Sequence, residues 1–138
     1  IRAVSEAVSA AIQGIADPWD RLEAGAMAHC AALLASGDKT AILDARFPPV
    51  LSSVRDQLIR CRDDHDRLFD QLIEPLDLPP EIDRRLLRLH VLGALNGACV
   101  WYRSSSRFKP EEIGRQVVEV IRHARTGGQA KGADAAKA

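Results

Sequence analysis

The sequence has no excess of charge of either sign, since 19 Lys and Arg residues balance 19 Asp and Glu residues. Proteins that hold nucleic acid by its phosphates need Lys and Arg concentrated on one face. The charge balance therefore argues against a chain that binds DNA or RNA by itself.

Long hydrophobic runs and paired cysteines are missing as well. The apolar run over residues 91–102 is shorter than the roughly 20 residues that cross a bilayer, and arginines bracket it closely. We therefore expect no membrane partner. Cys30, Cys61 and Cys99 lie far apart without a C-x-x-C motif, which favours a reducing cytoplasm over a disulfide framework or a zinc site.

Sequence signatures of catalysis are also absent. The chain shows no glycine-rich phosphate loop, paired-histidine metal site or catalytic triad. His29 and Cys30 are adjacent, but consecutive residues of a helix diverge by about 100° and cannot share a proton, so packing is the favoured role for both. We expect no enzymatic activity, no cofactor and no metal.

One histidine leaves alternatives open. His65 lies in the apolar stripe of a helix predicted over residues 49–74, and Asp63, Asp64 and Asp66 flank it. Adjacent helical residues point away from one another, which spoils shared metal coordination. A hydrogen-bonded histidine in the core or at a pocket edge is favoured, effector contact is the alternative, and a metal ligand or general base is disfavoured.

What the sequence does contain is helical periodicity. Apolar residues recur at spacings of three and four, and neither a strand pattern nor an internal repeat is found. The length suits one compact domain. We predict an all-α, antiparallel bundle of about six helices over residues 2–14, 18–35, 38–46, 49–74, 79–103 and 110–125.

Two of these helices have clear apolar stripes, and the stripe of the first predicts which residues point inward. In the helix over residues 18–35 the stripe is Trp19, Leu22, Ala26, Cys30 and Leu33. In the last helix it is Ile113, Val117, Val120 and Ala124, with Ile121 at the edge.

The sequence at each end predicts what lies beyond the compact domain. The first residues already follow helical spacing and do not begin with Met, so we expect an upstream segment outside this sequence. Apolar periodicity stops after residue 125. We therefore expect a domain over residues 1–125 and a disordered tail over residues 126–138.

The helix over residues 79–103 is apolar on two opposite sides and is expected to be central, covered by neighbours on both. Gly93 and Gly97 each cost a helix about 1 kcal/mol relative to alanine. Close approach of another backbone, from within the chain or from a second copy, would offset that cost. Asn96 needs a hydrogen-bond partner: a dimer seam or the backbone is favoured, and an effector is the alternative.

Several short patterns together resemble the C-terminal domain of TetR-family transcriptional regulators over roughly residues 1–125. They are Asp17-Pro18-Trp19, Leu86-Leu87 with Leu89, Gly93-Ala94-Leu95-Asn96, Trp101-Tyr102-Arg103 and Pro110-Glu111-Glu112-Ile113. The resemblance implies a homodimeric regulator that senses a small molecule. It implies that an N-terminal helix-turn-helix, absent from this sequence, binds operator DNA. It also implies that the last two long helices pair with their mates in a four-helix dimer interface.

The predicted sites follow from this arrangement. Expected effector-lining residues are Trp19, Leu22, Ala26, Cys30, Leu58, Cys61, His65, Phe69, Leu95 and Cys99, which suggest a hydrophobic or amphipathic effector of acyl or polycyclic type. Expected dimer-interface residues are Leu86, Leu89, His90, Gly93, Asn96, Gly97, Val100, Ile113, Val117, Val120 and Ile121. The alternatives are a structural dimerisation module without an effector and, less favoured, a small all-α enzyme with His65 as base.

Overall fold

The computed structural model describes residues 1–35 and 52–135. Within these ranges it contains five helices and no strand, so the all-α prediction is confirmed. The helix predicted over residues 38–46 lies outside the described residues. The helices are α1 (Arg2–Ala11), α2 (Pro18–Ala35), α4 (Ser52–Ile73), α5 (Arg84–Trp101) and α6 (Pro110–Ala135).

Local hydrogen bonds explain where helices begin. The Asp17 carboxylate accepts from the Asp20 backbone N–H at 2.9 Å, so α2 starts at the following Pro18. The Asp83 carboxylate accepts from the Leu86 N–H at 2.8 Å, so α5 begins at Arg84 and is shorter than the predicted helix over 79–103.

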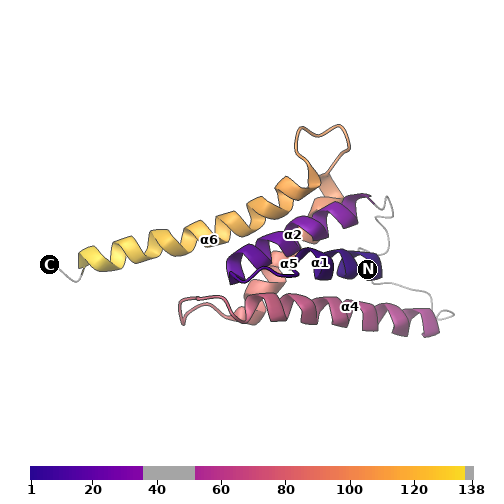
Figure 1. Cartoon of the computed structure of the whole chain (residues 1–138), viewed down its shortest axis with the longest axis horizontal. Coiled ribbons are helices and arrows are strands. Elements are labelled where there is room, and N and C mark those ends of the chain that lie inside the picture. The colour runs from indigo at the N-terminus through magenta and orange to yellow at the C-terminus, as the bar shows by residue number, and fades with distance from the viewer. Residues whose placement is uncertain (36–51, 136–138) are drawn as a thin grey trace.

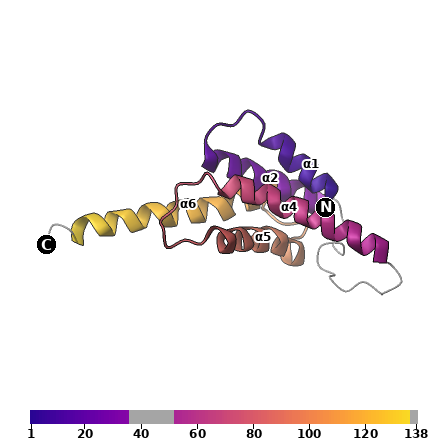
Figure 2. The same cartoon turned by 90° about the horizontal axis from the view of Figure 1, so that it is seen from below.

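Helix α2, and not α5, occupies the centre of the fold. It packs against each of the other four described helices, whereas α5 packs against α2, α4 and α6. Figure 1 shows α2 between α6 on one side and α1 and α4 on the other, and Figure 2 shows α5 at an edge of the bundle. The expectation of a central helix at 79–103 is therefore corrected.

The core gathers the apolar faces of all five helices around α2. The predicted inward stripe of α2 is confirmed, because each of its members is buried. The fully buried residues that meet this stripe from the other helices are Val8, Phe69, Val91, Leu95, Ala98 and Val118. Burial of these apolar side chains is the main stabilising term of the fold.

The tightest backbone approach is made by Gly114 of α6. A methyl group at this position would meet the Ala26 carbonyl oxygen of α2 and lie 2.7 Å from the Met27 backbone nitrogen. The two helices can therefore cross only because residue 114 has no side chain.

Helix α5 has one buried and one open face. Leu87, Val91 and Leu95 are buried against the protomer. At Gly93 and Gly97 an added methyl group would have no neighbour within 4 Å. None of the described residues therefore covers the notch formed by Gly93 and Gly97, so residues 1–35 and 52–135 supply no close backbone approach there.

Helix α6 differs from its prediction in length. It continues to Ala135 instead of ending near residue 125. Val118, which was outside the predicted stripe, is fully buried, whereas Val120, a predicted dimer-interface residue, is 66% exposed. The division into a domain over 1–125 and a tail over 126–138 stays a prediction.

In both views the C-terminal part of α6 projects beyond the other helices (Figures 1 and 2). In the part of the chain that the structure describes, no helix is long and apolar enough to cross a membrane.

Candidate functional site

A chain of four hydrogen-bonded side chains runs through the protein and joins four helices. Ser5 Oγ of α1 lies 2.8 Å from His65 Nδ1 of α4. His65 Nε2 lies 3.0 Å from His29 Nδ1 of α2, and His29 Nε2 lies 3.0 Å from Asn96 Oδ1 of α5. Both histidines are buried.

The donors and acceptors of this chain follow from its Asn96 end. An amide oxygen can only accept, so His29 Nε2 carries the hydrogen and the other nitrogen of a neutral His29 is an acceptor. His65 Nε2 must then donate to it, which leaves His65 Nδ1 to accept from the Ser5 hydroxyl. Every bond of the chain therefore runs in one direction, from Ser5 to Asn96.

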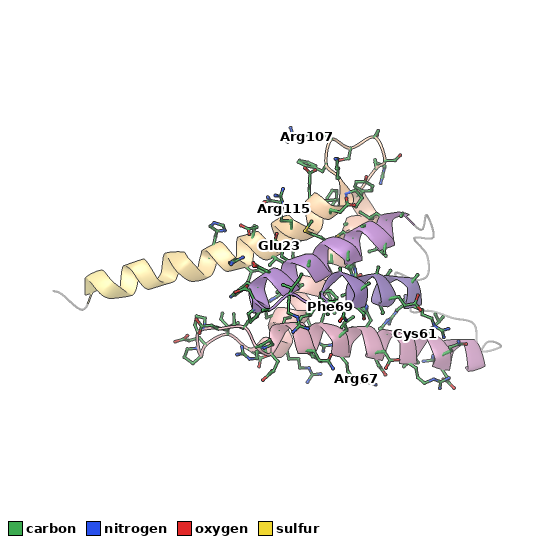
Figure 3. All side chains as sticks on the ribbon, in the orientation of Figure 1. Glu23, Cys61, Arg67, Phe69, Arg107 and Arg115 are labelled. Atoms are coloured by element: carbon green, nitrogen blue, oxygen red, sulfur yellow. The ribbon has the colours of Figure 1, made fainter. Side chains whose placement is uncertain are left out.

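The surroundings of the two histidines keep them neutral. Burial lowers the pKa of His29 to about 4, helped by the neighbouring His65, and burial also lowers the pKa of His65. The Phe69 ring stands edge-on to the His29 ring with centroids 5.7 Å apart. Figure 3 shows Phe69 pointing from α4 into the body of the protein, where it adds apolar surface to this environment.

A pocket of about 320 Å³ lies beside the polar chain, between the start of α1, α4 and α5. Its lining contains both histidines and Asn96 together with one cation and one carboxylate, and the remaining walls are apolar. The lining residues are Ile1, Val4, His29, Arg62, His65, Asp66, Leu89, Leu92, Gly93 and Asn96.

Two arginines close to this pocket differ in how they are paired. Arg88 of α5 lies 2.9 Å from Asp66 and 2.9 Å from Asp70, so it bridges the two carboxylates and ties α5 to α4. Arg62 makes no ion pair with any residue that the structure describes. Arg62 therefore remains able to bind an acceptor group at the pocket.

Of the ten predicted effector-lining residues, His65 lines this pocket. Leu58 and Cys61 are partly buried on α4. Burial raises the pKa of the Cys30 thiol to about 12, so it is not a nucleophile at neutral pH. The remaining predicted residues are buried in the core with Cys30: Trp19, Leu22, Ala26, Phe69, Leu95 and Cys99. The predicted lining as a set stays a prediction.

Sequence reasoning missed the role of His29, which it assigned to packing. A usable signal was present, because His29 follows Ala26 by three residues and precedes Leu33 by four, on the inward side of α2. Asn96, His65 and His29 are thus polar residues on buried stripes of three helices, and such groups need partners. The Asn96 oxygen finds its partner inside the protomer, and not in the backbone or a dimer seam as favoured.

The predicted dimer-interface residues divide by exposure. Leu86, Leu89, Val100 and Val120 are each at least half exposed, between 50% and 66%, and His90 and Gly93 are exposed as well. Asn96, Gly97, Val117 and Ile121 are half-buried, and Ile113 is buried. Exposed apolar side chains therefore follow one face of α5 and extend onto α6.

A second, larger hollow of about 830 Å³ lies where the α4–α5 connection faces α6. Leu78, Pro79 and Ile82 form one wall, and Val120 and Ile121 form the other. Val120 and Ile121 also belong to the predicted dimer interface, whereas none of the predicted effector-lining residues lines this hollow.

Within residues 1–35 and 52–135, no three His, Cys, Asp or Glu side chains are placed to hold a metal ion together. Comparison with known families gives a match over residues 16–124 to the model described as tetracyclin repressor-like, C-terminal domain. No curated protein matches the sequence significantly.

Proposed function

Because the chain belongs to the family of tetracyclin repressor-like C-terminal domains, we propose that it senses a small molecule and forms a homodimer. Domains of this family typically have these two roles in transcriptional regulators, and they are normally not enzymes. The effector state of the domain would control operator binding by a helix-turn-helix segment that precedes it, in the cytoplasm.

The single observation that carries this proposal is the two-sided environment of α5. One face packs into the protomer core, and the other presents exposed apolar side chains such as Leu86, Leu89 and Val100 around the open notch at Gly93 and Gly97. A contiguous apolar face of this kind marks a protein–protein interaction site. A second copy supplies a matching apolar face by symmetry.

Helix α5 contributes both to the proposed dimer interface and to the pocket. Leu89, Gly93 and Asn96 of α5 line the 320 Å³ pocket, and Leu89 and Gly93 also belong to the exposed face. An effector in the pocket therefore contacts the helix that would set the spacing of the two subunits. The effector would shift the equilibrium between two spacings of the subunits. The size of the shift is set by the difference between its affinities for the two spacings.

The pocket also weighs against the structural module without an effector. A filled core with no cavity larger than a few water molecules would favour that alternative. The observed volume lies at the lower end of the 300–1,000 Å³ that is usual for ligand sites, which supports the sensing role.

Sedimentation velocity tests the dimer. We expect the wild-type chain to sediment as a dimer and Gly97→Leu to sediment as a monomer with an unchanged far-UV circular dichroism spectrum. Gln57→Leu adds the same side chain at an exposed position of α4 and should remain dimeric. A monomeric wild type would refute dimerisation, and a dimeric Gly97→Leu would place the notch outside the seam.

A further inference from the structure

We propose that the pocket between α1, α4 and α5 is selective for a small organic anion, a carboxylate with an apolar body, held by Arg62 and the Asn96 side-chain amide. This inference rests on the proposed sensing function and specifies the chemistry of its effector. It follows from which polar groups of the pocket already have partners.

The acceptors of the pocket are largely occupied. His65 Nδ1 accepts from Ser5, His29 Nδ1 accepts from His65, and Asn96 Oδ1 accepts from His29. Oδ2 of Asp66 is bound by Arg88 at 2.9 Å. A ligand that brings only hydrogen-bond donors therefore has to compete with partners already in place at each of these groups.

Donors, in contrast, remain available. With its oxygen directed at His29, Asn96 keeps both amide hydrogens, and none of the described residues accepts from them. The guanidinium of Arg62 offers five N–H donors and has no carboxylate partner among the described residues. The pocket is thus matched to a ligand group that only accepts.

Charge distinguishes a carboxylate from a neutral carbonyl group. Asp66 already has Arg88 as an ion-pair partner, whereas Arg62, the one cationic side chain of the lining, has no carboxylate within ion-pair distance among the described residues. An anion in this position gains charge-assisted hydrogen bonds from Arg62, which are roughly twice as strong as neutral ones. A carboxylate also matches the planar fork of a guanidinium group.

The remaining walls specify the body of the ligand. Ile1, Val4, Leu89 and Leu92 are apolar and surround the polar end. The volume of about 320 Å³ suits a single ring or a short chain better than a polycyclic compound or a long acyl chain. A monocyclic or short aliphatic acid meets both conditions.

Isothermal titration calorimetry at constant ionic strength tests this selectivity with sodium benzoate and sodium hexanoate against benzamide and hexanamide. We expect at least one acid to bind about tenfold more tightly than its amide, since the amide lacks the negative charge. If each amide binds as tightly as its acid, or if neither acid binds, the inference is wrong.

Two variants and one control identify the donors. Arg62→Gln should weaken binding of the acid by about tenfold. Arg60→Gln makes the same charge change on an exposed part of α4 outside the lining and should leave binding within about twofold. Asn96→Asp keeps an acceptor for His29 but replaces the amide donors by a negative charge, so it should also abolish acid binding. Equal binding by Arg62→Gln and Arg60→Gln would overturn the assignment of Arg62.

These outcomes also separate the inference from the proposed function. Binding of neutral ligands without preference for acids would leave the sensing role intact and overturn only the anion selectivity. A wild type that is monomeric and binds neither class would count against the function itself.

Discussion

His29 and His65 form a buried pair whose bond direction, and whose low cost of burial, depend on both rings staying neutral. His29 Nδ1 accepts from His65 Nε2 at 3.0 Å, and this is possible only while His29 Nδ1 carries no proton. Protonation of His29 would reverse this bond, with His65 switching to the tautomer that donates from Nδ1 to Ser5 Oγ, and would place a positive charge in the core. The pair is therefore stable at neutral pH and sensitive to acid.

Stability should fall as the pH drops below about 6.5. The pKa of His29 is about 4 in the folded protein against an ordinary 6.5, so the unfolded chain binds this proton more readily. The His29 contribution is complete above pH 6.5 and is lost as the pH falls toward 4. We expect a loss of about 2 kcal/mol between pH 7.5 and pH 5, measured by urea denaturation.

A variant isolates the contribution of His29 from that of other groups. Glutamine does not titrate, so His29→Gln should show a smaller loss of stability over the same pH interval, with the remaining loss including that from His65, whose pKa is lowered in the same direction. A variant with the same pH dependence as the wild type would contradict the role assigned to His29.

The crossing of α2 and α6 depends on one glycine. A methyl group at residue 114 has no space against the backbone of Ala26 and Met27. Gly114→Ala should therefore push the helices apart and lower the free energy of unfolding by about 2–3 kcal/mol, measured by chemical denaturation.

Gly93→Ala is the matched control for this substitution. Residue 93 is also in a helix interior, but the position is open. Compared in the monomeric Gly97→Leu background, where the proposed dimer interface is disrupted, the higher helix propensity of alanine at residue 93 should stabilise the protomer by up to about 1 kcal/mol. A Gly114→Ala variant as stable as Gly93→Ala would show that the close contact does not limit the crossing.

Apolar periodicity predicts the buried face of α2 but not the full packing of α6. The stripe of α2 was predictable because it is a single face of apolar residues that are all buried. Helix α6 has two apolar stripes, one through Val117 and Val120 and one through Gly114 and Val118, and only the first was recognised in the sequence. The contact of Gly114 with α2 depends on where the α2 backbone allows close approach. The sequence of α6 alone does not contain that information.

At the scale of the molecule, the polar chain links elements that are distant in the sequence. Ser5, His29, His65 and Asn96 come from four helices, and no motif joins them. The sequence identified His65 and Asn96 as polar residues in need of partners, but their pairing depends on how α2, α4 and α5 pack. The fold class could thus be predicted, whereas the site required the tertiary arrangement.

The projecting part of α6 leads to a prediction about where the domain ends. The C-terminal part of the α6 ribbon extends past the other helices (Figure 1), and in proteins most helical stability comes from tertiary packing. Deletion of residues 125–138 should therefore change the free energy of unfolding by less than about 0.5 kcal/mol. Deletion of residues 110–138 removes Ile113, Gly114 and Val118 from the core and should abolish cooperative thermal unfolding followed by circular dichroism. If the shorter deletion also abolishes it, residues 125–138 are an integral part of the domain.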